Sequence, residues 1–176
     1  MEKRFFREEP DKKAALEKSG CDFLCTLLRK TQGAIGLYKA MPEEFDVSSV
    51  VERLADREFA YPRMTAEQSL EFVLNPSEWT THLYGVDEPL GPTVNLNDLA
   101  VILVPGVAFD HRGFRLGMGK GFYDRALKGF SGMTIGIGFN QQVQREPLPV
   151  NDWDLPLNFI VTDQLVLNLV DMKTAS

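Results

Sequence analysis

The chain of 176 residues contains little cysteine and histidine, and it has no long apolar run. No stretch approaches the roughly 20 consecutive apolar residues that cross a bilayer. The N-terminal segment MEKRFFREEPDKK carries charges where a secretory signal needs an apolar core. We therefore expect a soluble, cytoplasmic protein with no membrane partner.

The scarce cysteines and histidines argue against sites built from these residue types. Cys21 and Cys25 lie four residues apart on a predicted helix, a spacing that suits neither a disulfide framework nor a C-x-x-C metal or redox motif. His82 and His111 have no partners at the spacing of a zinc site. We expect all four to be structural or surface residues.

Positive charge is also in short supply, because the formal net charge is −6. Such a chain has no global basic field to attract a nucleic acid backbone, so any anionic ligand must meet a local basic cluster. The length and an apolar content of 44% suffice for one ordinary core, so we expect one domain over residues 1–176.

Apolar periodicity predicts alternating helices and strands. Helices are expected over residues 10–30, with Ser19 and Gly20 as a point where the helix can break, over 47–54 with Asp46 or Ser48 as the cap, and over 122–130. A turn is expected over residues 88–92. Strands are expected over residues 34–38, 58–61, 69–74, 79–86, 99–104, 134–139 and 159–162, and the continuous apolar run 99–104 should be central in a parallel sheet. The pattern predicts a three-layer α/β/α domain with a mostly parallel sheet.

The stretch RLGMGKGFYDR, residues 115–125, is rich in glycine and fits neither common phosphate motif. The G-x-x-x-x-G-K-[ST] motif would need glycine at Phe114 and a hydroxyl at Gly121, and G-x-G-x-x-G finds Phe122 where its last glycine belongs. Glycines still let backbone N–H groups approach an anion, and Lys120 adds charge. Asp124 can hold Mg²⁺ against phosphates. A magnesium-nucleotide site is one interpretation; a glycine-rich turn with a surface Arg–Asp pair is the other.

A longer stretch of the sequence gives a more specific indication of function. The segments VPGVAFD (104–110) and GFRLGMGKGFYDR (113–125) closely resemble the 5-formyltetrahydrofolate cyclo-ligase family, also called methenyltetrahydrofolate synthetases. Weaker agreement runs in the same order through KRFFR (3–7), MPEEFD (41–46), YPR (61–63), GVDEP (85–89) and the downstream Leu148-Pro149 and Asp154.

The resemblance implies a fold and a reaction. The fold would be the family's three-layer α/β architecture, related to sugar-phosphate isomerases and CoA-transferases. The activity would be the ATP- and Mg²⁺-dependent conversion of 5-formyltetrahydrofolate, with or without a polyglutamate tail, into 5,10-methenyltetrahydrofolate, ADP and phosphate. In that mechanism the formyl oxygen attacks the γ-phosphate to give an N5-iminium phosphate, and N10 then closes the ring. We expect a monomer.

The resemblance also assigns site residues. Arg115, Lys120 and Tyr123 would be catalytic, and Mg²⁺ would be held by Asp124 and Asp154. The residues implied for ATP are Lys3, Arg4, Phe5, Phe6, Arg7, Arg115, Leu116, Gly117, Met118, Gly119, Lys120, Gly121, Phe122 and Tyr123. The residues implied for the folate are Lys39, Glu44, Tyr84, Met118, Gly119, Lys120, Gly121 and Phe122.

Several of these assignments have alternatives. Glu44 can instead be a solvated loop acid, and Tyr84 can be an inward-facing strand residue. Many family members carry glutamate and histidine where this chain has Asn151 and Trp153, so Asp152 competes with Asp154 as the metal ligand. Met118 also replaces a commoner tyrosine or arginine. A non-catalytic nucleotide- or folate-binding protein, or a nucleotide-dependent kinase or ligase for another substrate, remains an alternative function.

Overall fold

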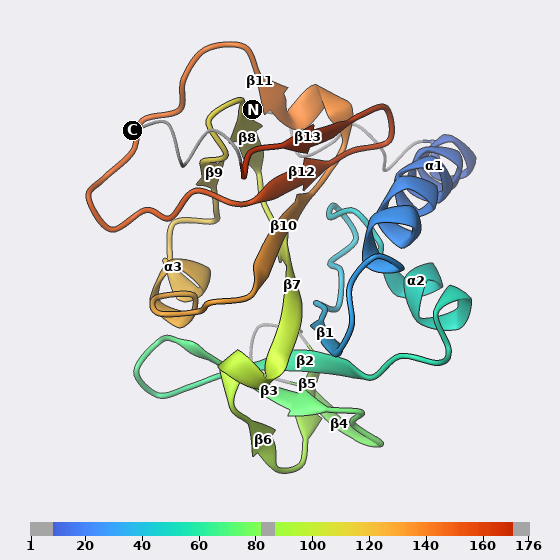
Figure 1. Cartoon of the computed structure of the whole chain (residues 1–176), viewed down its shortest axis with the longest axis vertical. Coiled ribbons are helices and arrows are strands. Elements are labelled where there is room, and N and C mark those ends of the chain that lie inside the picture. The colour runs from blue at the N-terminus through green and yellow to red at the C-terminus, as the bar shows by residue number, and fades with distance from the viewer. Residues whose placement is uncertain (1–8, 82–86, 171–176) are drawn as a thin grey trace.

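The computed structural model describes residues 9–81 and 87–170, and within them the dominant feature is an eight-stranded sheet (Figure 1). The strand order is β13-β12-β10-β7-β1-β2-β3-β6. The five neighbours from β12 to β2 are all parallel, whereas β13, β3 and β6 run antiparallel to their neighbours. The strands are β1 (Ala34–Gly36), β2 (Phe59–Met64), β3 (Leu70–Leu74), β6 (Thr93–Val94), β7 (Leu99–Pro105), β10 (Met133–Ile137), β12 (Phe159–Val161) and β13 (Val166–Asn168).

The predicted central strand is confirmed. β7 lies between β1 and β10 and is parallel to both. Its residues Val101 to Val104 are all buried, because both faces of the sheet are covered. This explains the continuous apolar run, since a strand in a one-sided sheet would alternate apolar and polar residues.

Two helices cover one face of the sheet. α1 (Pro10–Leu28) and α2 (Ser48–Arg53) lie together on that side (Figure 1). α1 is continuous, so the break considered at Gly20 does not occur. A Cβ at Gly20 would lie 2.6 Å from the Phe45 ring, so this glycine permits close packing. Cys21 and Cys25 are buried and free in the core on this face, as expected.

The opposite face is covered by one short helix and a small sheet. α3 (Phe122–Ala126) lies there, followed by the buried Leu127 (Figure 1). The three-stranded sheet has the order β11-β8-β9, where β8 is Ala108–Asp110, β9 is Arg115–Leu116 and β11 is Val143–Gln144. Two cores, one on each face, confirm the α/β class and its layering. The relation to sugar-phosphate isomerases stays a prediction.

The structure differs from the secondary structure predicted from the sequence in four further respects. Residues expected to form a turn belong to β5 (Asp87–Leu90), which pairs with β4 (Glu78–Thr81). The predicted helix 122–130 ends at Ala126, because turns follow it in which Lys128 N donates to Arg125 O and Phe130 N donates to Leu127 O, with Gly129 at φ +83°. The N-cap of α2 is Val47, although Asp46 Oδ1 accepts from Ser48 N at 2.8 Å. Strands β6, β8, β9, β11 and β13 were not predicted. The rest of the predicted strand 79–86 lies outside the described residues. Short 3₁₀ turns are η1 (Leu96–Asp98) and η2 (Asn140–Gln142).

The connections after β1 and β7 leave toward opposite faces. The chain after β1 passes through α2 on the α1 side, whereas the chain after β7 passes through the small sheet and α3 on the other side (Figure 1). Adjacent parallel strands with such connections define a topological switch point. In open α/β sheets the ligand crevice lies beside the carboxyl ends of those two strands.

Candidate active site

A pocket of about 920 Å³ lies at this switch point. Its lining includes Tyr38 and Lys39 just after β1, and Pro105 and Gly106 at the end of β7. Small-molecule pockets span about 300–1,000 Å³, so this one lies at the upper end of that range and is large enough for an extended ligand.

Most of the expected site residues gather around this pocket. Those that line it are Lys39, Glu44, Arg115, Leu116, Gly117, Met118, Gly119, Lys120, Gly121, Phe122, Tyr123, Asp124 and Asp154. Asp152 does not line it, so the geometry favours Asp154 of the two competing aspartates. The expected residues that lie outside the described residues are Lys3, Arg4, Phe5, Phe6, Arg7 and Tyr84, and His82 lies outside them too.

The glycine-rich loop owes its shape to left-handed backbone. Gly119 has φ +82° and Gly121 has φ +64°, conformations that L side chains rarely adopt. Gly121 is the N-cap of α3, where hydroxyl residues are common, and its left-handed backbone explains why glycine stands there instead. Arg125 stabilises the loop, because its guanidinium donates to the carbonyl oxygens of Gln68 and of Lys120 within the loop.

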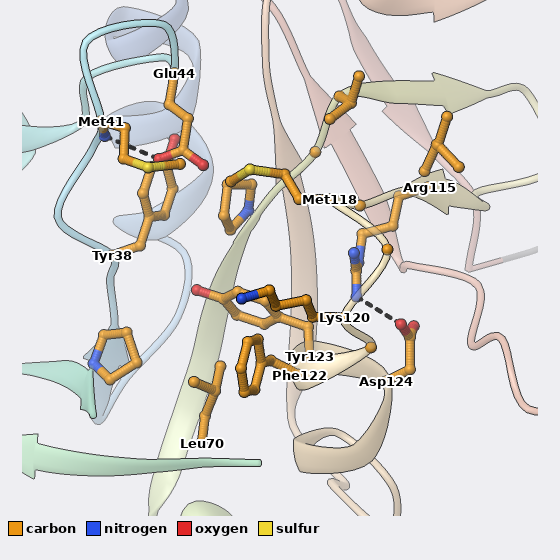
Figure 2. A pocket seen from close by; sticks show the side chains of 18 of the residues that line it. Tyr38, Met41, Glu44, Leu70, Arg115, Met118, Lys120, Phe122, Tyr123 and Asp124 are labelled. Carbon is orange, nitrogen blue, oxygen red and sulfur yellow. Dashed lines mark hydrogen bonds and ion pairs between the residues drawn. The ribbon is translucent and has the colours of Figure 1, made fainter. Parts of the chain in front are cut away.

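Arg115 is a buried cation with an unsatisfied donor. Its side chain is only 6% exposed, and Nη2 lies 3.1 Å from Oδ2 of Asp124 (Figure 2). The N–H bonds of Nη2 do not point at that oxygen, so Nη2 has no hydrogen bond within the described part of the chain. The guanidinium also lies 5.4 Å from the Tyr123 ring centre. A buried cationic donor that lacks a hydrogen bond is costly, and an anionic ligand in the pocket would satisfy it.

Gly117 makes room for that guanidinium. A Cβ at Gly117 would lie 2.7 Å from Nη1 of Arg115. The first glycine of the loop therefore lets the Arg115 side chain approach closely, whereas Gly119 and Gly121 are favoured by their positive φ angles.

Tyr123 projects from the start of α3 into the pocket, next to Lys120 in the view of Figure 2. Burial, followed by the nearby Glu44 carboxylate, raises the pKa of the Tyr123 hydroxyl, and Arg115 opposes this only in part. The phenol therefore stays protonated at neutral pH. It can donate a hydrogen bond but cannot act as a general base.

Glu44 lies on the wall that faces the glycine-rich loop (Figure 2). Its Oε2 accepts from Met41 N at 2.9 Å, so the loop after β1 holds the carboxylate in place. Tyr38 supports the same loop, because its buried hydroxyl donates to Phe45 O at 2.6 Å. The wall therefore presents a fixed carboxylate to the pocket, and its role in ligand binding stays a prediction.

Lys39 and the β4–β5 hairpin form an aromatic and charged end of the pocket. Lys39 Nζ contacts Asp87 Oδ2 at 2.5 Å and lies 4.9 Å from the centre of the Trp79 ring. Trp79 meets Tyr61 edge-on, with ring centres 5.1 Å apart. Sequence reasoning found Lys39 but missed Tyr61, Trp79 and Asp87. Packing of the separate β4–β5 sheet against β2 and the segment after β1 brings these residues together.

Other lining residues were also missed by sequence reasoning. Tyr38 follows β1 directly, so the switch-point rule could have identified it. Trp153 is 69% exposed and Val150 is 41% exposed, and no local sequence signal marks either as a pocket residue. Gln142 donates to the carbonyl oxygens of Gly106 and Val107 and thereby holds the segment after β7.

The carboxylates suit magnesium only together with a phosphate ligand. Among the described residues no group of three or more His, Cys, Asp or Glu side chains could hold a metal on its own. Mg²⁺ in phosphate sites is usually held by one or two carboxylates plus phosphate oxygens and water. Asp124 and Asp154, both hard oxygen donors lining the pocket, fit that smaller requirement. Asp154 also accepts from Asn151 N at 2.7 Å through Oδ2.

Two further predictions from the sequence concern features outside the pocket, namely His111 and membrane-spanning helices. His111 is exposed on the turn after β8 and does not line the pocket, as expected for a surface residue. No helix in the described ranges is long and apolar enough to cross a bilayer.

Together the fold and the pocket define a class: an α/β protein with a cationic, glycine-rich loop at the switch point of a parallel sheet. A sequence model of the 5-formyltetrahydrofolate cyclo-ligase family matches residues 26–163. The chain belongs to this enzyme family.

Individual relatives agree with this assignment. The 5-formyltetrahydrofolate cyclo-ligase of Haemophilus influenzae is 44% identical over 79 residues, which cover 42% of each chain. That of Escherichia coli K12 is 47% identical over 73 residues, which cover 40% of each chain. The chain thus matches about two fifths of the length of these curated relatives.

Solved structures extend the likeness along the fold. The NMR structure of Aquifex aeolicus 5,10-methenyltetrahydrofolate synthetase aligns with a TM-score of 0.79 and 33% identity, and covers 90% of this chain and 84% of that one. A 5,10-methenyltetrahydrofolate synthetase from Mycoplasma pneumoniae aligns with a TM-score of 0.70 at 24% identity, covering 87% and 88% of the two chains, and this match shows the fold alone.

Proposed function

We propose that this protein converts 5-formyltetrahydrofolate into 5,10-methenyltetrahydrofolate, using ATP and releasing ADP and phosphate. The observation that carries the proposal is the buried guanidinium of Arg115, whose Nη2 lacks a hydrogen bond. It lines the pocket beside the glycine-rich loop, whose backbone a ligand can approach closely. Family membership supports the choice of substrate class, and the pocket is large enough for an extended ligand.

In the proposed reaction the formyl oxygen on N5 attacks the γ-phosphorus of ATP, and the bond to the β-phosphate oxygen breaks. The resulting N5-iminium phosphate carries a good leaving group where the formyl group had a poor one. N10 then attacks the iminium carbon, phosphate departs, and N10 loses its proton to water, which closes the ring as the methenyl product. This chemistry asks the protein for positioning and charge neutralisation, and it needs no protein nucleophile.

The glycine-rich loop would serve the triphosphate. Arg115 and Lys120 would neutralise charge that develops on the transferred group. Tyr123, held protonated by its environment, would donate a hydrogen bond rather than remove a proton. Bound Mg²⁺, held by Asp124 and Asp154, would supply further charge neutralisation between the phosphate oxygens.

The opposite wall would serve the folate. Glu44 is held so that its carboxylate faces the pocket, and a carboxylate can accept paired N–H donors from the edge of a pterin ring. Lys39, beside Trp79, would add a cationic and aromatic contact to the same ligand. Because the two walls face one another, the formyl group can meet the γ-phosphate between them.

The direct test follows the absorbance of methenyltetrahydrofolate after mixing the protein with 5-formyltetrahydrofolate, Mg²⁺ and ATP. Matched reactions lack one component each, and ADP is measured in parallel. Product that requires all three components, with ADP formed in a one-to-one ratio, would support the proposal. Folded protein that binds ATP or the folate without forming product would instead indicate the binding-protein alternative or another acceptor.

A further inference from the structure

Two loops that line the pocket are both tied to one turn, which we call the 110–114 turn. This turn joins β8 to β9 and leads directly into the glycine-rich loop at Arg115. The second loop, residues 149–156, carries Val150, Trp153 and Asp154 into the pocket. The loops are far apart in sequence, so their relative position depends on contacts made through the turn.

Asp110 is the centre of the turn. It is only 1% exposed, and both of its carboxylate oxygens accept hydrogen bonds. Oδ1 accepts from Arg112 N at 2.9 Å and from Phe114 N at 3.1 Å. Oδ2 accepts from Arg112 Nε at 2.9 Å, from Arg112 Nη2 at 2.7 Å and from Leu148 N at 3.0 Å. One carboxylate thus binds its own turn and the residue just before the 149–156 loop.

Both ends of the 149–156 loop are anchored at this turn. At its start, Arg112 Nη2 donates to Leu148 O at 2.6 Å, in addition to the bond from Leu148 N to Asp110. At its end, Leu157 N donates to Gly113 O at 2.9 Å. Gly113 has φ +92°, and a Cβ there would lie 2.9 Å from Leu157 O. The loop therefore leaves the turn and returns to it.

We propose that Asp110 is a positioning residue that sets the 149–156 loop, with Asp154, against the glycine-rich loop, with Arg115 and Asp124. The inference rests on the proposed function for what the two loops hold, but the anchoring itself is independent of the ligand. Geometry errors of about 1 Å at a reacting centre can cost about 100-fold in rate. A carboxylate that fixes both loops therefore acts on catalysis without touching the substrate.

The test compares Asp110→Asn with Glu71→Gln as a matched control. The amide of Asp110→Asn keeps one acceptor oxygen and loses the charge and the second acceptor. Glu71→Gln removes the charge from a different ion pair, between β2 and β3, in which Nε and Nη2 of Arg63 both donate to Glu71 Oε1. Amide hydrogen exchange and steady-state kinetics with ATP and folate varied separately are measured for both variants.

We expect the amides of residues 149–156 and 115–121 to exchange at least tenfold faster in Asp110→Asn, while those of β7 and β10 stay within twofold of wild type. KM for ATP should rise at least tenfold, and KM for the folate should change less, because the Glu44 wall does not contact the turn. Glu71→Gln should leave both loops and both KM values within twofold.

Faster exchange confined to the 110–114 turn would overturn the proposal, and so would uniform acceleration through β7 and β10 or unchanged kinetics despite loosened loops. If Asp110→Asn does not fold, Arg112→Lys replaces it. That variant keeps the charge but shortens the reach to Leu148 O, and it should show the same pattern with changes of about threefold. If the wild-type protein forms no methenyl product, the proposed function fails, but the exchange experiment still decides the anchoring.

Discussion

Gly117→Ala offers a sharp test of the site, because the structure predicts lost activity without lost stability. The added Cβ would lie 2.7 Å from Arg115 Nη1, so the guanidinium must move. That atom is the end of a flexible side chain, and Gly117 does not have a positive φ, so the backbone is not strained. The melting temperature should stay within about 2 °C of wild type.

The activity should fall because Arg115 would leave both Asp124 and the triphosphate. A hydrogen bond to a charged group contributes about 1.5–3 kcal/mol. At about 1.4 kcal/mol per factor of ten, losing one such bond in the transition state lowers kcat/KM for ATP by about 10- to 100-fold. The assay is initial-rate formation of the methenyl product at varied ATP and fixed, saturating folate.

Gly129→Ala is the opposite control. Gly129 has φ +83°, lies outside the pocket, and a Cβ there would meet nothing within 4 Å. This variant should lose about 1–2 kcal/mol of stability from the left-handed backbone and keep its activity. A Gly117→Ala protein with wild-type kcat/KM for ATP would show that the position of Arg115 does not control the reaction.

Four further outcomes test the remaining parts of the site. Asp124→Asn should lower turnover by at least about 100-fold in a folded protein, since it removes the partner of Arg115 and a proposed metal ligand; unchanged turnover would remove Asp124 from the mechanism. Glu44→Gln should raise KM for the folate about tenfold or more and leave KM for ATP nearly unchanged, as measured by varying each substrate. Burial acts to raise the pKa of Asp110, but hydrogen bonds from Arg112 and backbone amides outweigh it and the net pKa is lowered; the stability that Asp110 contributes is therefore fully present above about pH 4 and is lost as the pH falls through the folded-state pKa. Urea unfolding at pH 3 and pH 6 should show the gap between wild type and Asp110→Asn shrinking at the lower pH, whereas a constant gap would contradict this. Deleting residues 1–7 should raise the ATP requirement far more than it lowers the melting temperature, and an unaltered KM for ATP would show that this segment does not bind the nucleotide.

The sequence predicted the parts of the fold that depend on local pattern. The apolar run 99–104 gave the central strand, and helical spacing over residues 10–30 gave α1, because periodicity directly reflects which faces are covered. Gly20 was misjudged as a break because its purpose is contact with Phe45, 25 residues away. Residues 88–90 were misjudged as a turn because Pro89 is common in turns, whereas here it pairs with Trp79 at the edge of a two-stranded sheet.

The same distinction between local pattern and long-range contact separates the pocket residues that were predicted from those that were missed. Residues within the contiguous 115–124 segment were found from the motif, and Glu44 and Asp154 came from weaker blocks in the same order. Trp79 and Tyr61 were missed because packing between two separate sheets brings them together at the pocket, and no local pattern reports that packing. The role of Asp110 was invisible for a related reason. Its position beside the motif is evident in the sequence, but its bond to Leu148, 38 residues downstream, is a property of the folded chain.

The pocket combines apolar side chains, which are unfavourable when exposed to water, with a buried cation, which is unfavourable when its donors lack hydrogen bonds. Of the ten exposed large apolar side chains in the described ranges, five line it: Trp79, Leu116, Met118, Val150 and Trp153. Apolar side chains concentrated around a pocket indicate a ligand with flat or apolar surface. The buried guanidinium of Arg115 pairs with Asp124 but keeps Nη2 without a hydrogen bond, and an anionic ligand at the same place would supply one. A ligand that is only anionic would leave the apolar rim exposed, and one that is only aromatic would leave Arg115 unsatisfied. A nucleoside triphosphate carries both kinds of surface, and so does a folate with its flat pterin and its carboxylates, so the lining of the pocket is compatible with the substrates of the proposed reaction.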